Sequence, residues 1–329
     1  MTLPAVAILG DINIDFTLHV DAYPPEGGEG IATREIQNIG GSATNTAMFL
    51  AKLGMPVRFI GKVGQDAWGE RCLADMATAG IDTRRVCRTS EEPTQVNVVV
   101  VSRSGERTMF AYRGANTRLN AREIDAGTFE AVALLHLSGY ALLQAPQRDA
   151  AIRALDLARA RNIPATLDVP SGVVTAIRSP LDNLLLHLET LFLSEADLLA
   201  LSGEATIEAA ANALLSKGVR NLVVKAGERG AFLWNDEGRR HAPAMPAEVI
   251  DTTGAGDAFA AGYIYGTVRG LSAVSRLTLA NAAGAVAVSN TGDVGTWASA
   301  DALHAKLRSC GVDQAALREI DLPRKQKTT

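Results

Sequence analysis

The sequence predicts an α/β protein with a doubly wound, mostly parallel sheet flanked by helices and a second, small antiparallel β-sheet. Short apolar runs alternate with amphipathic segments along most of the chain, which is typical of strands alternating with helices in a parallel sheet. Two regions, 16–41 and 86–116, break this alternation with β-branched runs between glycine, proline and serine turns. We therefore expect a single domain over 1–329, with these two regions forming a small antiparallel sheet that projects from the main one.

The apolar runs give the expected order of elements. Strands of the main sheet are expected at 5–11, 57–64, 132–139, 164–169, 190–194 and 221–227. Helices are expected at 42–53, 67–79, 146–161, 207–217, 254–269, 272–289 and 299–308. Residues 95–112 predict a hairpin that turns at Ser104 and Gly105. Ligands of such sheets bind at the carboxyl ends of the strands.

Composition and charge narrow the class of partner. The formal net charge is −4, and no block of Lys and Arg occurs before the last few residues, so a nucleic-acid partner is not expected. No charge-free stretch approaches the ~20 residues that cross a bilayer, so no membrane partner is expected either. The cysteines Cys72, Cys87 and Cys310 are far apart and form no zinc motif, which indicates a reducing, cytoplasmic location. The expected partners are small molecules.

The segment 249–266, VIDTTGAGDAFAAGYIYG, carries the clearest chemical signal. Its Gly-Ala-Gly, Gly254 to Gly256 with Ala255 between them, stands where a helix begins, so its N–H groups lack helical partners and can cradle an anion. Asp257 follows in the first turn, where it can take a proton from a hydroxyl while the amides stabilise a transferring phosphoryl group. A purely structural alternative is that Asp251 or Thr253 caps the helix and Asp257 complements its dipole.

Other nucleotide motifs are absent. The only Gly-Lys pair, Gly61 and Lys62, is followed by Val63, so the chain has no P-loop. No GxGxxG follows the first strand, which disfavours a nicotinamide dehydrogenase.

Two long motifs resemble one known family. Residues 251–266 resemble the C-terminal signature of the ribokinase-like (PfkB) carbohydrate kinases, and residues 40–70 resemble their N-terminal signature. The resemblance covers about residues 4–308 and implies the ribokinase-like fold. It also implies ATP and Mg²⁺ as cofactors and transfer of the γ-phosphoryl group to a hydroxyl of a sugar, sugar acid or nucleoside. Asp257 would be the base, and the amides of residues 254–256 would form the anion hole.

The resemblance also implies the acceptor side of the cleft. Substrate contacts are implied for Asn13, Asp15, Gly40, Gly41, Asn45, Tyr112 and Arg113. The Tyr-Arg pair is similar to that of 2-keto-3-deoxygluconate kinases and fructokinases, and its guanidinium suits a carboxylate or ring hydroxyls. Ser42 and Ser138 stand where ribokinases usually carry Lys and Glu, which disfavours ribose. The segments 16–41 and 86–116 resemble the lid of this family, which closes over the substrate. Lids of this family often pair between subunits, so a homodimer through the lid is expected.

On the nucleotide side, the resemblance places Lys225 and Gly227 under the phosphates and ribose, and Asn281 beside the base. Ser194 and Asp197 occupy the family's Asn-x-x-Glu motif. Asp197 can orient water bound to Mg²⁺, whereas Ser194 is too short to reach the phosphates as an Asn would. A monovalent-cation site, for K⁺, is implied at Asp251, Thr253, Ala287, Gly292 and Thr296.

Taken together, these residues predict an ATP-dependent kinase of a small sugar or sugar acid. One alternative is a nucleoside kinase of the same family, although a base prefers an aromatic clamp and aromatic residues are only 5% of the chain. The other is a non-catalytic regulator that binds a sugar or nucleotide. The altered motif at Ser194 keeps that alternative open, and the intact Gly-Ala-Gly-Asp argues against it.

Overall fold

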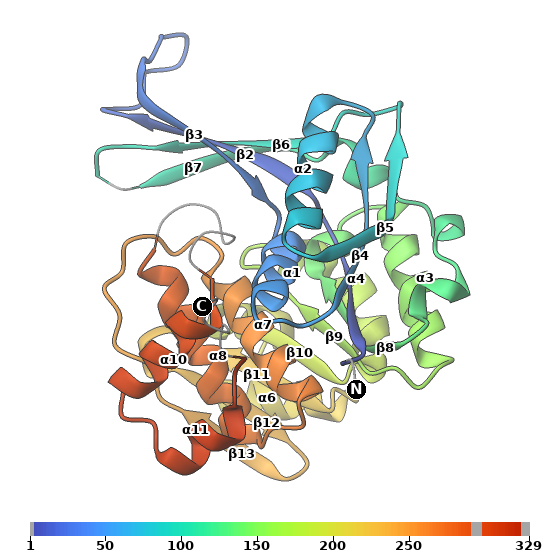
Figure 1. The fold of residues 1–329 in the computed structure, drawn as a ribbon, viewed down its shortest axis with the longest axis vertical. Coiled ribbons are helices and arrows are strands. Elements are labelled where there is room, and N and C mark those ends of the chain that lie inside the picture. Colours follow the sequence, from blue (N-terminus) through green and yellow to red (C-terminus); the bar gives the residue numbers. More distant parts are fainter. Residues whose placement is uncertain (1–2, 105, 291–297, 324–329) are drawn as a thin grey trace, which may run out of the picture.

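The computed structural model describes residues 3–104, 106–290 and 298–323. A nine-stranded sheet in the order β13-β12-β11-β10-β9-β8-β1-β4-β5 forms its centre, and a second sheet in the order β3-β2-β6-β7 projects from one side (Figure 1). The strands from β11 to β5 in this order are parallel, whereas β12 and β13 are added antiparallel. After β1 the chain adds β4 and β5 on one side of that strand. It then crosses over and adds β8 to β13 on the other side.

The bounds of the elements follow the chain. The strands are β1 (Ala5–Leu9), β2 (Asn13–Val20), β3 (Ala32–Gly40), β4 (Val57–Gly64), β5 (Ile81–Thr89), β6 (Gln95–Val101), β7 (Arg107–Tyr112), β8 (Val132–Ser138), β9 (Ala165–Asp168), β10 (Thr190–Ser194), β11 (Asn221–Lys225), β12 (Ala231–Asn235) and β13 (Gly238–Ala242). The helices are α1 (Ser42–Lys52), α2 (Ala67–Thr78), α3 (Gln147–Arg159), α4 (Val174–Leu184), α5 (Glu195–Ser202), α6 (Ile207–Ser216), α7 (Ala255–Val268), α8 (Ala273–Val288), α10 (Ala300–Ser309) and α11 (Gln314–Ile320).

The doubly wound sheet is confirmed, and each expected strand and helix is present with small shifts at its ends. The sequence analysis missed β5, β12, β13, α4, α5 and α11. β5 and β13 are rich in arginine because they are the edge strands of the sheet, where side chains reach solvent and apolar runs are not needed. One expectation needs correction: residues 86–89 belong to β5 in the main sheet, so the second lid segment begins only at β6.

The two faces of the sheet carry separate hydrophobic clusters. Successive residues of β1 point to opposite faces, so Val6 and Ile8 pack with α1, α7 and α8, whereas Ala7 and Leu9 pack with α3, α4 and α6. Both faces are thus covered by helices, which explains why the central strands are continuous apolar runs.

The lid consists of two hairpins, β2–β3 and β6–β7, joined by a parallel pairing of β2 with β6. β2 follows β1 after three residues, so the chain passes straight from the main sheet into the lid. It returns through Gly40 and Gly41 into α1. Gly41 has φ 107°, and a Cβ there would lie 2.3 Å from the Asp11 carbonyl oxygen. The two glycines therefore let the lid approach the body closely.

No single helix among the described residues is long and apolar enough to cross a membrane. Only α5 and α6 taken as a pair, bent by 60°, meet the criteria of length and composition.

Asp66 connects α2 with the entrance to the lid, and its loss should destabilise the protein. Its carboxylate caps α2 by accepting from the Gly69 amide at 2.8 Å and also accepts from the Thr94 amide at 2.7 Å. We expect Asp66→Ala to lower the free energy of unfolding by about 2 kcal/mol in urea titrations at pH 7. These bonds lower the pKa of Asp66, so the difference should shrink as the pH falls through that lowered pKa. Asp236→Ala, at an exposed turn, is the control, and equal losses in both variants would contradict this role.

Candidate active site

The N-terminus of α7 forms the centre of the site. Gly254 is its N-cap and adopts the left-handed conformation with φ 72°, which lets the chain turn sharply into the helix. The first amides of a helix have no partner within it and carry the positive end of its dipole. The Ala255 amide makes only a long contact, 3.3 Å, to the Thr252 carbonyl. The turn can therefore receive an anion, as its sequence predicts.

Asp257 lies one residue beyond this cradle and is held by α1. Its two carboxylate oxygens accept hydrogen bonds from Ser42 Oγ at 2.7 Å and from Asn45 Nδ2 at 2.8 Å. Burial raises the pKa of Asp257 to about 6, and the hydrogen bonds from Asn45 and Ser42 oppose this rise. A carboxyl group with this pKa is ionised near neutral pH and is still basic enough to accept a proton.

A cation lies on the other side of the cradle. Lys225, at the end of β11, pairs with Asp168, at the end of β9, with 2.7 Å between Nζ and Oδ1. A Cβ placed on Gly256 would lie 3.2 Å from the same Nζ. The ammonium is thus next to the cradle, and the second glycine leaves space between them.

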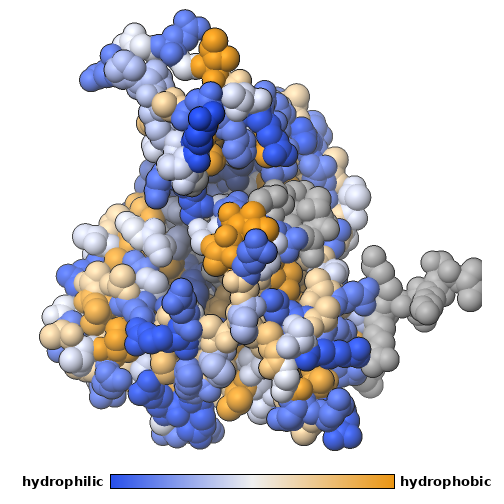
Figure 2. Space-filling view, turned by 90° about the vertical axis from the view of Figure 1, so that its left-hand side faces the viewer, coloured by the Kyte–Doolittle hydropathy of each residue, from blue (hydrophilic) through white to orange (hydrophobic). Residues whose placement is uncertain are grey.

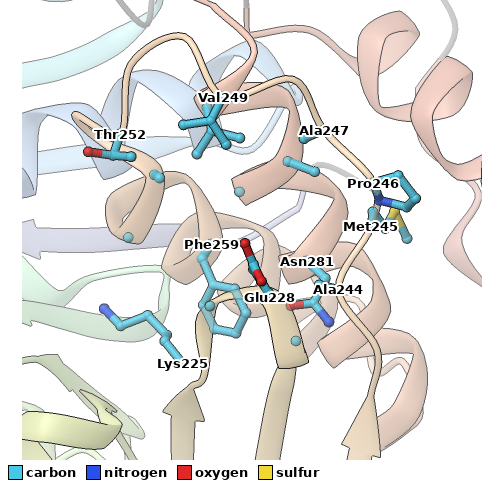
Figure 3. Close-up of a pocket in the computed structure, with 17 residues that line it drawn as sticks. Lys225, Glu228, Ala244, Met245, Pro246, Ala247, Val249, Thr252, Phe259 and Asn281 are labelled. Carbon is cyan, nitrogen blue, oxygen red and sulfur yellow. The ribbon is translucent and has the colours of Figure 1, made fainter. Parts of the chain in front are cut away.

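A cavity of about 590 Å³ opens from the cradle toward α8 (Figure 3). Its lining residues are Lys225, Gly227, Glu228, Gly230, Ala244, Met245, Pro246, Ala247, Val249, Thr252, Ala255, Gly256, Phe259, Asn281, Gly284, Ala285 and Val288. The lining is mostly apolar away from the cradle, and Lys225 marks its polar end. Asn281 donates to the carbonyls of Ala242 and Pro243, each at 2.9 Å, so its amide also fixes the chain that leaves β13.

Ser194 and Asp197 bind each other. Ser194 is the N-cap of α5; its Oγ accepts from the Asp197 amide at 3.1 Å and donates to Asp197 Oδ2 at 2.5 Å. Asp197 is buried, and its charge helps to raise the pKa of Asp168, although burial is the larger cause. Within the described residues no group of three metal-ligating side chains occurs, so these carboxylates would need water or substrate oxygens to complete a coordination shell.

The residues predicted to contact the acceptor lie where the lid meets the body. Asp15 Oδ1 accepts from Asn13 Nδ2 at 2.7 Å and from Asn97 Nδ2 at 2.8 Å. A Cβ on Gly40 would lie 2.0 Å from Asp15 Oδ2, so this carboxylate is packed against the glycine turn that leads to Asn45. Burial raises the pKa of Asp15, and the bonds from Asn97 and Asn13 oppose the rise. Figure 2 shows the lid as a projection above a hollow in the body.

The side chains of Tyr112 and Arg113, which are predicted to contact the substrate, are bonded to other residues of the protein. Tyr112 is 59% exposed and its hydroxyl donates to Glu92 at 2.7 Å. Arg113 forms a bidentate ion pair with Asp11, at 2.8 and 3.0 Å, and donates to Gln147. Its charge is therefore already balanced within the protein.

The predicted monovalent-cation residues are only partly described. Asp251 accepts from the Thr253 amide at 2.8 Å and lies 3.6 Å from Arg107 of the lid, which also binds the Thr253 hydroxyl. The Ala287 carbonyl accepts from the Asn290 amide. Gly292 and Thr296 lie outside the described residues.

Several residues of the site were missed by the sequence analysis. Asp168 ends an apolar strand and Asp11 follows another, and both positions could have been found from the rule that ligands bind at carboxyl ends of strands. Asn97 could not have been found this way, because its neighbours in the sequence are the valines of a lid strand.

Asn45 should control the pKa of Asp257. We expect Asn45→Ala to raise this pKa above about 6, because it removes a donor that stabilises the carboxylate. Carbon NMR of the Asp257 side-chain carboxyl during a pH titration measures the change. Asn183→Ala, at an exposed position whose amide donates only to Ser179 within α4, should leave this pKa unaltered. An unchanged or lower pKa in Asn45→Ala would contradict the hydrogen bond.

Comparisons with known proteins show what this chain is similar to. A family model described as "pfkB family carbohydrate kinase" matches residues 4–300. The 5-dehydro-2-deoxygluconokinase of Shouchella clausii is 29% identical over 262 residues, 76% of this chain and 80% of that protein.

Solved structures extend the likeness to the whole fold. Arabidopsis thaliana ribokinase, complexed with ribose and ATP, superposes with a TM-score of 0.82 at 26% identity, covering 94% of this chain and 99% of that one. A protein described as ribokinase II from E. coli, in complex with ATP and Mg²⁺, gives a TM-score of 0.83 at 25% identity, covering 93% and 100%.

Proposed function

The chain belongs to the pfkB family of carbohydrate kinases, and from this membership we propose how its residues carry out the reaction. It is an ATP-dependent phosphotransferase that phosphorylates a hydroxyl of a small sugar or sugar acid. The observation that carries the proposed mechanism is the placement of Asp257 between the donors of α1 and the cradle of α7.

In this mechanism Asp257 is the general base. It takes the proton of the acceptor hydroxyl as the acceptor oxygen bonds to the γ-phosphorus of ATP, and the bond from that phosphorus to the bridging oxygen of ADP breaks. Charge on the transferring group is stabilised by the amides of residues 254–256 and by Lys225. Asp168 keeps the Lys225 ammonium beside the cradle.

ATP occupies the cavity of Figure 3, with its phosphates at Lys225 and its base in the apolar part near Phe259 and Asn281. Bound Mg²⁺ would neutralise the charge of the phosphates, and the carboxylates of Asp168 and Asp197 would hold it through coordinated water. Ser194 caps α5 and donates to Asp197, so its hydroxyl would have to give up this hydrogen bond before it could contact a phosphate.

The charges on the acceptor side favour a neutral sugar. Asp15 and Asp257 both face this region, and Arg113 is neutralised by Asp11. A substrate carboxylate would face the carboxylates of Asp15 and Asp257. Arg113 is already paired with Asp11, so it would not balance that charge. Hydroxyl groups, in contrast, can donate to both carboxylates.

Three further parts of the proposal concern assembly and conditions. A homodimer through the lid is supported by its exposed apolar side chains Ile31, Met109 and Phe110. K⁺ activation rests on Asp251, Thr253 and the resemblance to the family. A cytoplasmic location rests on the cysteine content.

A screen of acceptors tests the function. ADP release is measured with ATP and Mg²⁺ over pentoses, hexoses, ketoses, sugar acids, sugar phosphates and nucleosides. We expect neutral sugars to give the highest kcat/KM, with sugar acids at least about tenfold lower because of the two facing carboxylates. Higher kcat/KM for a sugar acid would contradict the neutral acceptor, stimulation only by nucleosides would favour the nucleoside kinase, and no stimulation by any alcohol would favour the regulator.

Asp257→Asn tests the base. We expect kcat to fall about a thousandfold, because the amide cannot accept the proton, while the Kd of ATP stays within about threefold. In the unmodified enzyme, kcat should decline as the pH falls through about 6, since protonated Asp257 is inactive. Asp301→Asn, at an exposed position in the first turn of α10, is the matched control. Near-normal turnover in Asp257→Asn would rule out the role.

A further inference from the structure

A continuous chain of side-chain amides runs from the protein backbone to Asp15. The Ile12 amide donates to Asn116 Oδ1 at 3.0 Å, and Asn116 Nδ2 donates to Gln95 Oε1 at 2.8 Å. Gln95 Nε2 then donates to Asn97 Oδ1 at 3.0 Å, and Asn97 Nδ2 donates to Asp15 Oδ1 at 2.8 Å. We call the side chains of Asn116, Gln95 and Asn97 the amide relay.

The backbone fixes the direction of every bond in the relay. The Ile12 N–H can only donate and the Ile12 carbonyl, which accepts from Asn116 Nδ2 at 2.9 Å, can only accept. Asn116 thus has one allowed orientation. Each following amide must turn its oxygen toward the previous donor, because two facing oxygens or two facing NH₂ groups would lose a hydrogen bond in a buried place. All three relay residues are buried.

The lid strands bring these groups together. In the parallel pair β2–β6, Asn13 is in register with Gln95 and Asp15 with Asn97. Residues two apart on a strand lie on the same face, so these four polar side chains share one face of the lid sheet. Asn116 lies in the turn after β7. Its hydrogen bonds to the Ile12 amide and carbonyl connect the relay to the backbone.

We propose that the amide relay is a positioning device that keeps Asp15 a hydrogen-bond acceptor for the substrate. Asn97 of the relay and Asn13 both donate to Oδ1 of Asp15. Oδ2 of Asp15 accepts no hydrogen bond from the described residues and lies against Gly40. Asp15 therefore offers Oδ2 to a hydroxyl of the acceptor, and Asn97 brings the lid into substrate recognition without touching the substrate. This inference rests on the proposed sugar kinase function.

Isosteric variants of Gln95 test the direction of the relay with ATP and the best acceptor of the screen. In Gln95→Glu the new carboxylate forces Asn97 to turn its amide around, so its oxygen faces Asp15. We expect the acceptor KM to rise at least about tenfold, the scale of losing one hydrogen bond to a charged group, while kcat and the ATP KM stay within about twofold. Gln95→Met leaves Asn97 free to donate and should raise the acceptor KM less than about threefold.

Gln37→Glu is the matched control, since it makes the same change on the opposite face of the lid sheet and should leave the acceptor KM unaltered. Asn97→Leu is a second test that adds no charge, and it can be used if Gln95→Glu does not fold. It removes the donor to Asp15 and should also raise the acceptor KM about tenfold. Equal effects of Gln95→Glu and Gln95→Met, or parallel changes in kcat and both KM values, would overturn the relay.

Neutron diffraction from deuterated protein without substrate tests the relay independently of any acceptor. Deuterons of Asn97 directed at Asp15 support it, and the Asn97 oxygen directed at Asp15 overturns it. If the deuterons support the relay while no alcohol stimulates ADP release, the sugar kinase function fails and the orientation of Asp15 stands.

Discussion

The hydrogen bonds from α1 to Asp257 are the constraint on which the site depends. They join the first turn of α7, which carries the anion cradle, to the first turn of α1, which starts at the glycine turn leaving the lid. One buried carboxylate thus connects the nucleotide side, the acceptor side and the lid. Gly40 and Gly41 are necessary for this, because any side chain there would collide with Asp15 or with the Asp11 carbonyl.

The buried carboxylates of the cleft differ in what surrounds them, and this difference separates their roles. Burial raises the pKa of Asp257, and its hydrogen bonds come from neutral groups that only partly oppose this rise, so it remains a base. Asp168 and Asp11 each hold a cation, Lys225 and Arg113. Burying a charge is costly unless it is paired or hydrogen-bonded, so each partner is as necessary as the acid itself.

The two ends of the cleft follow different recognition principles. The cavity beside α8, which we propose as the ATP site, is largely apolar and has a lysine and the first amides of α7 at one end. The acceptor end is built from buried amides and acids whose hydrogen bonds are fixed by the lid strands. Specificity for hydroxyl groups depends on such fixed polar groups, because a ligand that lacks the matching donor leaves them unpaired.

The sequence by itself determined the doubly wound sheet, the glycine turn that begins α7 and the position of Asp257 in the first turn of that helix, because strand and helix periodicity and the residues of one turn are local properties. It did not reveal that Arg113 is bound by Asp11, that Lys225 is held by Asp168, or that Asn97 orients Asp15. These pairs join residues between 57 and 102 positions apart in the chain. Only the tertiary structure decided them, since strand order and register determine which distant side chains meet and therefore which charges remain free.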